Sequence, residues 1–231
     1  QHPLYVVRVS TILDESFTEI RKHEVLKKEG LLVEYADDDP NPVLFCSHTW
    51  LRRSAPDNSQ HVKLTLLKSV LRRAVEGSLG DLSPHWLTAL AYKEESAALH
   101  LQADDLRKLK EGYVFFDYMS IPQEDREAQG RAIASLVSYV SSSAYFMCLA
   151  GPWTHEDFGA ARDDLAWSGR GWCRMELAAN ALSPVAKPMI LACSPSRVVT
   201  LPPGGAIGRE FLVAARVGHG DFTVDADKLE L

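Results

Sequence analysis

The hydrophobic positions of the chain form short continuous runs that alternate with stretches of helical spacing. The runs predict strands over 43–48, 113–117, 144–150 and 187–193. Continuous apolar runs of this length, bounded by turn residues, are typical of strands buried on both faces of a parallel sheet. Apolar residues at every third or fourth position predict helices after Pro56 and over 84–111, 126–140 and 170–182. The alternation predicts an α/β fold with helices on both faces of the sheet.

Smaller elements are expected at the two ends of the chain. Residues 1–40 are predicted to be an extension packed on the core, with a strand at 5–9, a helix at 15–29 that Gly30 ends, and a loop at 37–42. Residues 41–231 are expected to form one α/β domain, with a helical insertion at about 78–111 after the first core strand. A short helix around 210–217 and a weak strand at 222–224 complete the prediction.

Polar side chains begin abruptly where the first two core strands end. They are Ser47, His48 and Trp50 after the first strand and Asp117, Tyr118 and Ser120 after the second. Ligands bind beyond the carboxyl ends of the strands in parallel sheets. A stretch at 151–169, long for a loop in a compact domain, leads to the same edge. The sequence therefore predicts a site that three distant segments share.

The helix after this loop carries an acid on a face that is not wholly apolar. Trp172, Glu176 and Asn180 lie four residues apart and so share one face. A separate stripe is predicted to pack on the core; it consists of Met175, Ala178, Ala179 and Leu182. An acid, an indole and an amide thus lie on the side that the core does not fully cover, and we expect function there.

Three motifs, in this order, resemble the TIR (Toll/interleukin receptor) domain family. They are Phe45-Cys-Ser-His48, Val114-Phe-Phe-Asp117 with a proline-bearing loop, and Trp172-Cys-Arg-Met-Glu-Leu177. The third is the most specific, and the match covers roughly residues 43–193. The resemblance implies a flavodoxin-like parallel sheet of about five strands. In catalytic members it also implies hydrolysis of NAD at the nicotinamide–ribose bond, with the motif glutamate, here Glu176, essential.

The chemistry of this bond suits a single glutamate. Nicotinamide leaves as a neutral group, and the sugar becomes oxocarbenium-like, so a nearby carboxylate can stabilise the charge or hold the ribose hydroxyls. The alternative is that Glu176 is a surface acid favoured by the helix dipole. Trp172 either walls the pocket, excluding water and raising the pKa of the glutamate, or packs at the helix start.

The strand-end residues are candidates for binding the nucleotide. Ser47 and His48 point to opposite faces of a strand, which argues against a nucleophile–base pair; they either hold ribose or phosphate or anchor the loop. Trp50 and Tyr118 are candidate stacking surfaces for a nicotinamide or adenine ring. The alternative is that their side chains only pack within their loops.

Two further polar residues follow the second strand. Asp117 either orients its loop by accepting backbone N–H bonds or faces the ligand, and Ser120 is a further candidate for binding the nucleotide. Asp57 and Asn58 are interpreted first as a helix cap.

Composition and charge limit the classes of binding partner that the sequence predicts. With 25 basic and 31 acidic residues, the net charge of −6 argues against a nucleic-acid binder. The four cysteines lack metal-ligand spacing and are expected to be buried thiols in a reducing, cytoplasmic compartment. No membrane-spanning run or secretory signal is found. His155-Glu156-Asp157 does not have metal-site geometry and is expected to be a solvated loop, so no metal is predicted.

Two functions remain open. The first is an NAD-consuming hydrolase or cyclase in intracellular signalling or defence, with NAD as substrate and no prosthetic group. The second is a catalytically inactive TIR-like scaffold for protein–protein assembly. It is favoured by the long insertion and by Ser47-His48, where the family has a serine–arginine pattern. A nucleoside-processing transferase is a weaker third alternative. Because the chain begins at Gln1, we expect it to be a piece of a larger protein, and we expect self-association.

Overall fold

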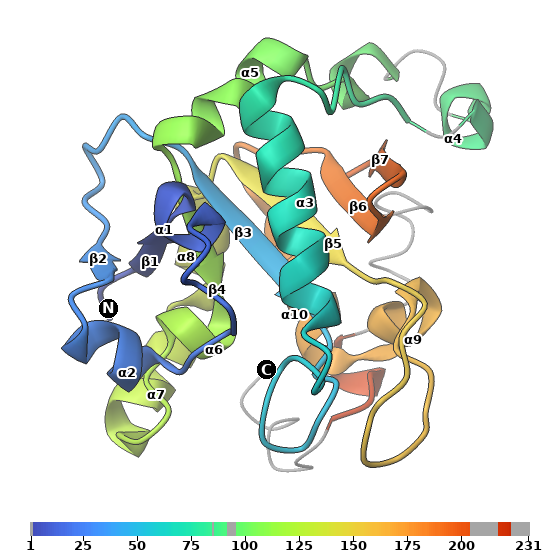
Figure 1. The fold of residues 1–231 in the computed structure, drawn as a ribbon. Helices are drawn as coiled ribbons and strands as arrows, with labels where there is room; N and C mark the ends of the chain where they lie inside the picture. The colour runs from blue at the N-terminus through green and yellow to red at the C-terminus, as the bar shows by residue number, and fades with distance from the viewer. Residues whose placement is uncertain (1, 85, 92–95, 204–216, 223–231) are drawn as a thin grey trace.

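A mixed seven-stranded sheet runs through the computed structural model, which describes residues 2–84, 86–91, 96–203 and 217–222 (Figure 1). The strand order is β2-β1-β4-β3-β5-β6-β7. The four parallel strands in the middle are β3 (Val43–His48), β4 (Tyr113–Phe116), β5 (Tyr145–Leu149) and β6 (Met189–Ser194). These are the four strands that the apolar runs predict, and the α/β class is confirmed.

Three antiparallel strands widen the sheet beyond the expected five parallel ones. They are β1 (Tyr5–Arg8), β2 (Leu32–Glu34) and β7 (Arg197–Leu201). β1 pairs with β4, β2 pairs with β1, and β7 pairs with β6. The residues expected as an N-terminal extension are therefore hydrogen-bonded into the sheet. β2 and β7 lack a continuous apolar run because both lie at edges and are partly exposed.

The helices are mostly short. They are α1 (Val9–Leu13), α2 (His23–Lys28), α3 (Val62–Glu76), α4 (Trp86–Ala91), α5 (Ala103–Arg107), α6 (Asp117–Ser120), α7 (Arg126–Ala134), α8 (Leu136–Ser142), α9 (Asp164–Gly169) and α10 (Gly171–Leu182). Short 3₁₀ helices lie at Ser96–Leu99, Lys108–Glu111 and Val217–His219. No helix among the described residues is long and apolar enough to cross a membrane.

Several predicted helices differ from the observed ones. The helix expected at 126–140 is broken at Ser135, which lies between α7 and α8. The helix expected at 15–29 is reduced to α2, and Gly30, at a φ of 70°, follows its end as predicted. The insertion, expected to be helical over 84–111, contains several short helical pieces among its described residues. The predicted helix around 210–217 and strand at 222–224 lie almost wholly outside the described residues.

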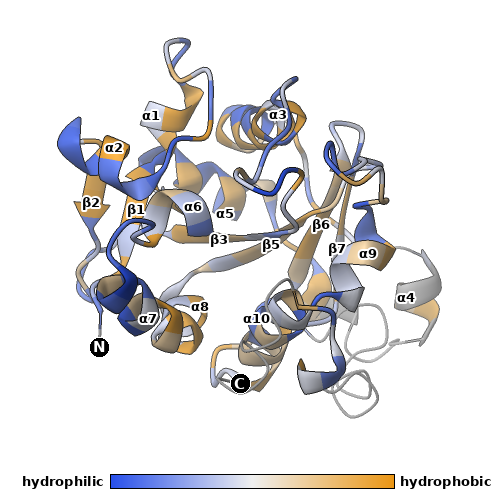
Figure 2. Cartoon of the chain, turned by 90° about the horizontal axis from the view of Figure 1, so that it is seen from below, coloured by the Kyte–Doolittle hydropathy of each residue, from blue (hydrophilic) through white to orange (hydrophobic). Residues whose placement is uncertain are grey.

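Side chains of β3 alternate between the two faces of the sheet. Leu44 and Cys46 belong to the core under α3, whereas Val43 and Phe45 belong to the core under α8 and α10. Figure 2 shows α3 over one face and α8 and α10 over the other. Asp57, as predicted, caps α3: its carboxylate accepts the N–H groups of Lys63 and Leu64 at 2.9 and 2.8 Å.

The path of the chain through the parallel strands defines where a ligand fits. From β3 the chain passes to β4 on one side and then crosses back to β5 on the other side. Strand connections therefore diverge at the carboxyl end of β3. Such a switch point leaves a crevice outside the strand ends, where ligands bind in open α/β sheets.

Candidate functional site

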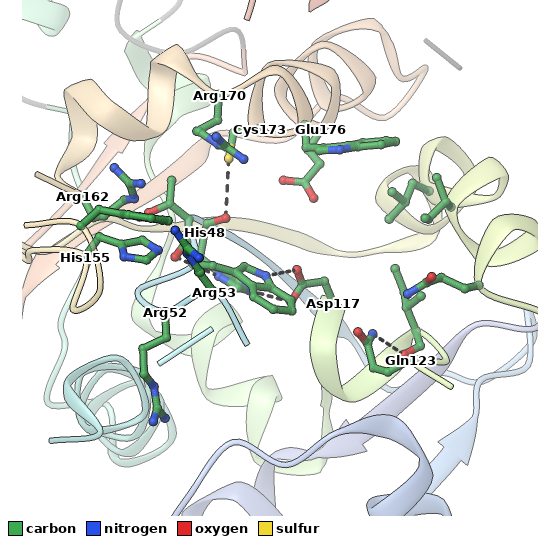
Figure 3. A pocket seen from close by; sticks show the side chains of 18 residues that line it. His48, Arg52, Arg53, Asp117, Gln123, His155, Arg162, Arg170, Cys173 and Glu176 are labelled. Carbon is green, nitrogen blue, oxygen red and sulfur yellow. Dashed lines mark hydrogen bonds and ion pairs between the residues drawn. The ribbon is translucent and has the colours of Figure 1, made fainter. Parts of the chain in front are cut away.

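A pocket of about 890 Å³ opens beyond the carboxyl ends of β3 and β4 (Figure 3). Its volume is in the range of small-molecule sites. The structure brings five of the predicted site residues to its wall: His48, Trp50, Asp117, Trp172 and Glu176. The other three, Ser47, Tyr118 and Ser120, are not part of the wall.

Glu176 is held by a chain of hydrogen bonds that runs from Trp167 of α9 through Ser47 of β3. The Ser47 hydroxyl donates to Oε2 of Glu176 at 2.5 Å, and the indole N–H of Trp167 donates to Ser47 Oγ at 2.9 Å. An indole N–H can only donate, so the serine oxygen accepts there and its own proton points to the glutamate. Trp167, buried in α9, therefore fixes the direction of the bond that Glu176 receives.

Burial raises the pKa of Glu176 to about 8. The hydrogen bond from Ser47 opposes this increase, and the negative charge of Asp117 adds to it. At neutral pH the carboxyl is consequently protonated for most of the time. A positive charge that enters the pocket favours its ionised form.

A second chain of polar contacts lies on the α3 side of β3. His48 donates from Nε2 to Asp117 Oδ1 at 2.9 Å, while its Nδ1 lies 3.3 Å from Nζ of Lys63. Lys63 is fully buried and also donates to the carbonyl of Thr49. Burial lowers the pKa of Lys63 to about 8. Burial likewise lowers the pKa of His48, so its ring is neutral and carries its proton on Nε2.

Asp117 combines the two roles that the sequence left open. Its carboxylate accepts the Tyr118 N–H at 2.5 Å and the Trp50 indole N–H at 2.9 Å, so it anchors its loop. It is also a third exposed and lines the pocket. Burial opposes ionisation, but His48 and the donated hydrogen bonds lower the pKa of Asp117 below its usual value. The group is an ionised carboxylate at the pocket wall.

The aromatic candidates differ in their access to the pocket. Trp50 lines it, and Tyr118 packs edge-on against Trp50 with ring centroids 5.5 Å apart. Tyr118 thus supports a pocket residue rather than offering a surface to a ligand. Ser120 is buried, and its hydroxyl accepts the N–H of Phe116 at 3.2 Å. It does not line the pocket, because the short helix α6 turns this side chain back onto β4.

The helix α10 presents the predicted acid and indole to the pocket, but not the amide. Trp172 lines the pocket and also packs edge-on against Phe222. Asn180 is fully buried and binds the backbone of Lys187. Leu182, expected in the core, is 74% exposed because α10 ends there. Cys173 is a buried thiol, as expected, and burial raises its pKa well above its usual value.

The loop after β5 contradicts one expectation. His155 is 4% exposed and lines the pocket, so the loop around it is not simply solvated. Two backbone hydrogen bonds fold this loop back on itself. The His155 N–H donates to the Ala160 carbonyl, and the Arg162 N–H donates to the Trp153 carbonyl. The pocket wall there also includes the arginines Arg53, Arg162 and Arg170.

Several of these site residues were missed by sequence reasoning. Trp167 and Lys63 act through contacts with residues that lie 120 and 15 positions away in the chain. The one available signal for Lys63 was a charged residue among the apolar positions of α3. The grouping of arginines from residues 52–53, 162 and 170 depends on the path of the loops.

Comparison of the chain with protein-family models, with curated proteins and with solved structures finds no match. Among the described residues, no group of three or more His, Cys, Asp or Glu side chains is placed to hold a metal ion. The function must therefore be argued from the pocket itself.

Proposed function

We propose that this protein cleaves the nicotinamide–ribose bond of NAD or a closely related nucleotide, with Glu176 acting at the glycosidic carbon. The observation that carries the proposal is the partly buried carboxyl of Glu176, which accepts a hydrogen bond from Ser47 and lines a pocket of about 890 Å³. The order of the four parallel strands, with the second beside the first and the third on its other side, is that of flavodoxin-like sheets. It supports the TIR-like resemblance.

The reaction requires Glu176 in its ionised form. NAD carries a positive charge on its nicotinamide ring, and this charge favours loss of the carboxyl proton when the ring enters the pocket. As the bond breaks, its electron pair goes to the nicotinamide nitrogen and the ring leaves neutral. The positive charge then lies on the ribose, where the Glu176 carboxylate stabilises it.

Water completes the hydrolysis. It adds to the glycosidic carbon and gives up one proton, which solvent finally takes up. Asp117 suits the transfer because its carboxylate is ionised and lies on the same pocket wall. His48, neutral and fixed by its bond to Asp117, is the positioning residue for that carboxylate.

The test is release of nicotinamide from NAD by purified protein, both alone and clustered on a scaffold. Glu176→Gln keeps the shape of the side chain but removes its charge. We expect it to lower kcat by about a hundredfold or more. Glu127→Gln on α7 is the matched control, because Glu127 is largely exposed and is not part of the pocket wall. No release by wild-type protein in either state, or equal release by Glu176→Gln, would refute the proposal.

One observation favours the scaffold alternative. On α4, in the insertion, Trp86 and Leu90 are 66% and 57% exposed and lie four residues apart. Exposed apolar side chains of this size on one helix face suit a protein interface. A Trp86→Ser, Leu90→Ser variant that loses self-association in sedimentation while nicotinamide release is absent throughout would favour this function over catalysis.

A further inference from the structure

One side of the pocket is cationic although the protein as a whole is acidic. Arg53, His155, Arg162 and Arg170 all line it, in a chain with a net charge of −6. Figure 3 shows Arg53, His155 and Arg162 together on the side away from Asp117 and Glu176. The pocket therefore has an acidic end, where the glycosidic bond is proposed to lie, and a cationic end with no role in the reaction described above.

Packing holds the cationic end in place. The guanidinium of Arg53 lies over the Phe158 ring at 4.5 Å, and the His155 ring lies 4.3 Å from the same ring. The folded-back loop brings Arg162 next to His155, since Thr154 and Ala161 pair across it. Arg170 directly precedes α10, whose N-terminal dipole adds positive potential.

Two of the guanidinium groups at this end, those of Arg53 and Arg162, have no ion-pair partner among the described residues. The adjacent Arg52, by contrast, pairs with Glu156. Asp157 is close to His155, but its carboxylate accepts the backbone N–H of Arg53. Burial lowers the pKa of Arg162, and the neighbouring Arg170 lowers it further. The repulsion between the charges of Arg162 and Arg170 destabilises the free protein, and a bound anion offsets that cost.

The histidine adds a directed donor. Its Nδ1 accepts the N–H of Asp157 at 3.2 Å, so the ring proton lies on Nε2. Burial, followed by the charge of Arg162, lowers the pKa of His155 and keeps the ring neutral. The cationic end thus offers two guanidinium groups and one neutral N–H donor, a combination that suits phosphate oxygens.

We infer that Arg53, Arg162 and His155, with Arg170 behind them, form a subsite for the diphosphate of a dinucleotide whose glycosidic bond lies at Glu176. This inference rests on the proposed function, which it deepens by naming the part of the substrate that is recognised. A dinucleotide places a diphosphate between two ribose groups and so matches a pocket that is acidic at one end and cationic at the other. A nucleoside lacks the anion that the cationic end requires.

Binding is measured by calorimetry on Glu176→Gln protein, in which we expect turnover to be at least about a hundredfold slower. The probes are ADP-ribose, inorganic pyrophosphate and nicotinamide riboside. Arg53→Gln and Arg162→Gln are each expected to weaken ADP-ribose binding by about tenfold to a hundredfold. We expect the affinity for nicotinamide riboside to change by less than about twofold. Arg53 is exposed, so its replacement does not endanger the fold. Arg72→Gln, exposed on α3 and outside the pocket, is the matched control.

The outcomes separate this inference from the proposed reaction. In one outcome, ADP-ribose binds and its affinity depends on the arginines, but wild-type protein releases no nicotinamide from NAD. This outcome would support the subsite and refute the proposed reaction. Release of nicotinamide together with unchanged ADP-ribose affinity in Arg53→Gln and Arg162→Gln would overturn the subsite alone. Equal weakening of ADP-ribose and nicotinamide riboside would also overturn it, because the arginines would then act on the pocket as a whole.

Discussion

Glu176 is an acid that must lose its proton before it can stabilise a positive charge. In the free protein its pKa is about 8, chiefly because of burial, so only a minority of molecules is ionised at neutral pH. In the reaction proposed here, the cationic ring of NAD would favour the ionised form once bound. On that proposal, the carboxylate becomes effective mainly when the ligand is present.

This coupling predicts two different pH profiles. The value of kcat/KM for nicotinamide release reports the free protein and should rise with pH through about 8. The value of kcat reports the complex and should rise through a lower pH, since the bound cation lowers the pKa of Glu176. Steady-state rates between pH 5.5 and 9 measure both. Profiles that fall over this range would show that Glu176 acts as an acid instead.

Ser47 tunes the same group. Its hydroxyl donates to the Glu176 carboxylate, and this bond lowers the pKa of Glu176 against the effect of burial. Ser47→Ala should therefore move the rising limb of kcat/KM to higher pH. Trp167→Phe keeps the hydroxyl but removes the donor that directs it, so we expect a smaller shift in the same direction. If the pH dependence of kcat/KM is the same in Ser47→Ala as in wild type, Ser47 does not control the ionisation of Glu176.

At the scale of residues, the sequence pointed to the acid but not to what controls it. Glu176 was recognisable from its helix and its motif. The opposite directions of Ser47 and His48 followed from the strand, and they are observed: Ser47 contacts Glu176, and His48 contacts Lys63 and Asp117. Trp167 and Lys63 were not foreseen, because spacing along the chain does not reveal a hydrogen bond between distant segments.

Among the elements, α2 has a role that its position in the N-terminal extension does not suggest. Figure 1 shows α2 beside α6. Glu24 of α2 accepts the backbone N–H groups of Gln123 and Glu124 at 2.6 and 2.9 Å, and Nδ1 of His23 lies 3.2 Å from the Ser120 carbonyl oxygen. Gln123 lines the pocket. The extension therefore holds the loop that forms one wall of the site.

Removing the Glu24 carboxylate should make the loop at residues 123–124 more mobile without changing the rate of the chemical step. Glu24→Ala is expected to speed amide hydrogen exchange at Gln123 and Glu124 and to raise KM for NAD several-fold, while kcat changes little. The exposed Glu19→Ala variant, in the same extension, serves as the control. Exchange at the two amides that is as slow in Glu24→Ala as in wild type would argue that the loop is held by its own packing.

The predictability of the elements follows from where they lie. The four central strands are covered on both faces, so their sequences are almost continuously apolar and were predicted correctly. The edge strands β2 and β7 face solvent on part of their surface, and β2 is only three residues long. They exist because a neighbouring strand offers free backbone groups, which is a tertiary effect that leaves little trace in local sequence.

For the whole molecule, the site is maintained at a cost in stability that depends on pH. Glu176 and Lys63 are both ionisable groups whose pKa values burial moves towards neutrality, to about 8 in each case. Folding therefore opposes the charge of each group over part of the pH range. The two contributions fall in different pH windows, because one group is an acid and the other is a base.

Lys63 makes the free energy of unfolding depend on pH only above about pH 8. Its pKa is lower in the folded protein than the usual 10.5, so the unfolded chain binds more protons between about pH 8 and 10.5. The destabilisation from burying its charge is full below pH 8 and is relieved as the pH rises through this window. Lys63 thus contributes no pH dependence between pH 5 and 7, where the effect of Glu176 can be measured by itself.

The Glu176 window lies between its usual pKa of 4.5 and about 8. Because the folded protein binds more protons there, the free energy of unfolding contributed by this group is fully present below pH 4.5 and is lost as the pH rises to 8. Glu176→Gln cannot lose a proton, so it should gain stability relative to wild type across this window. The difference is at most about 5 kcal/mol and is smaller to the extent that pocket water reaches the carboxyl.

Denaturant unfolding of both proteins at pH 5, 6.5 and 8 measures this difference in stability, and Glu127→Gln should show no such trend. A difference that stays constant with pH would mean that Glu176 is ionised in the free protein, and the substrate-induced ionisation proposed for this site would then be wrong.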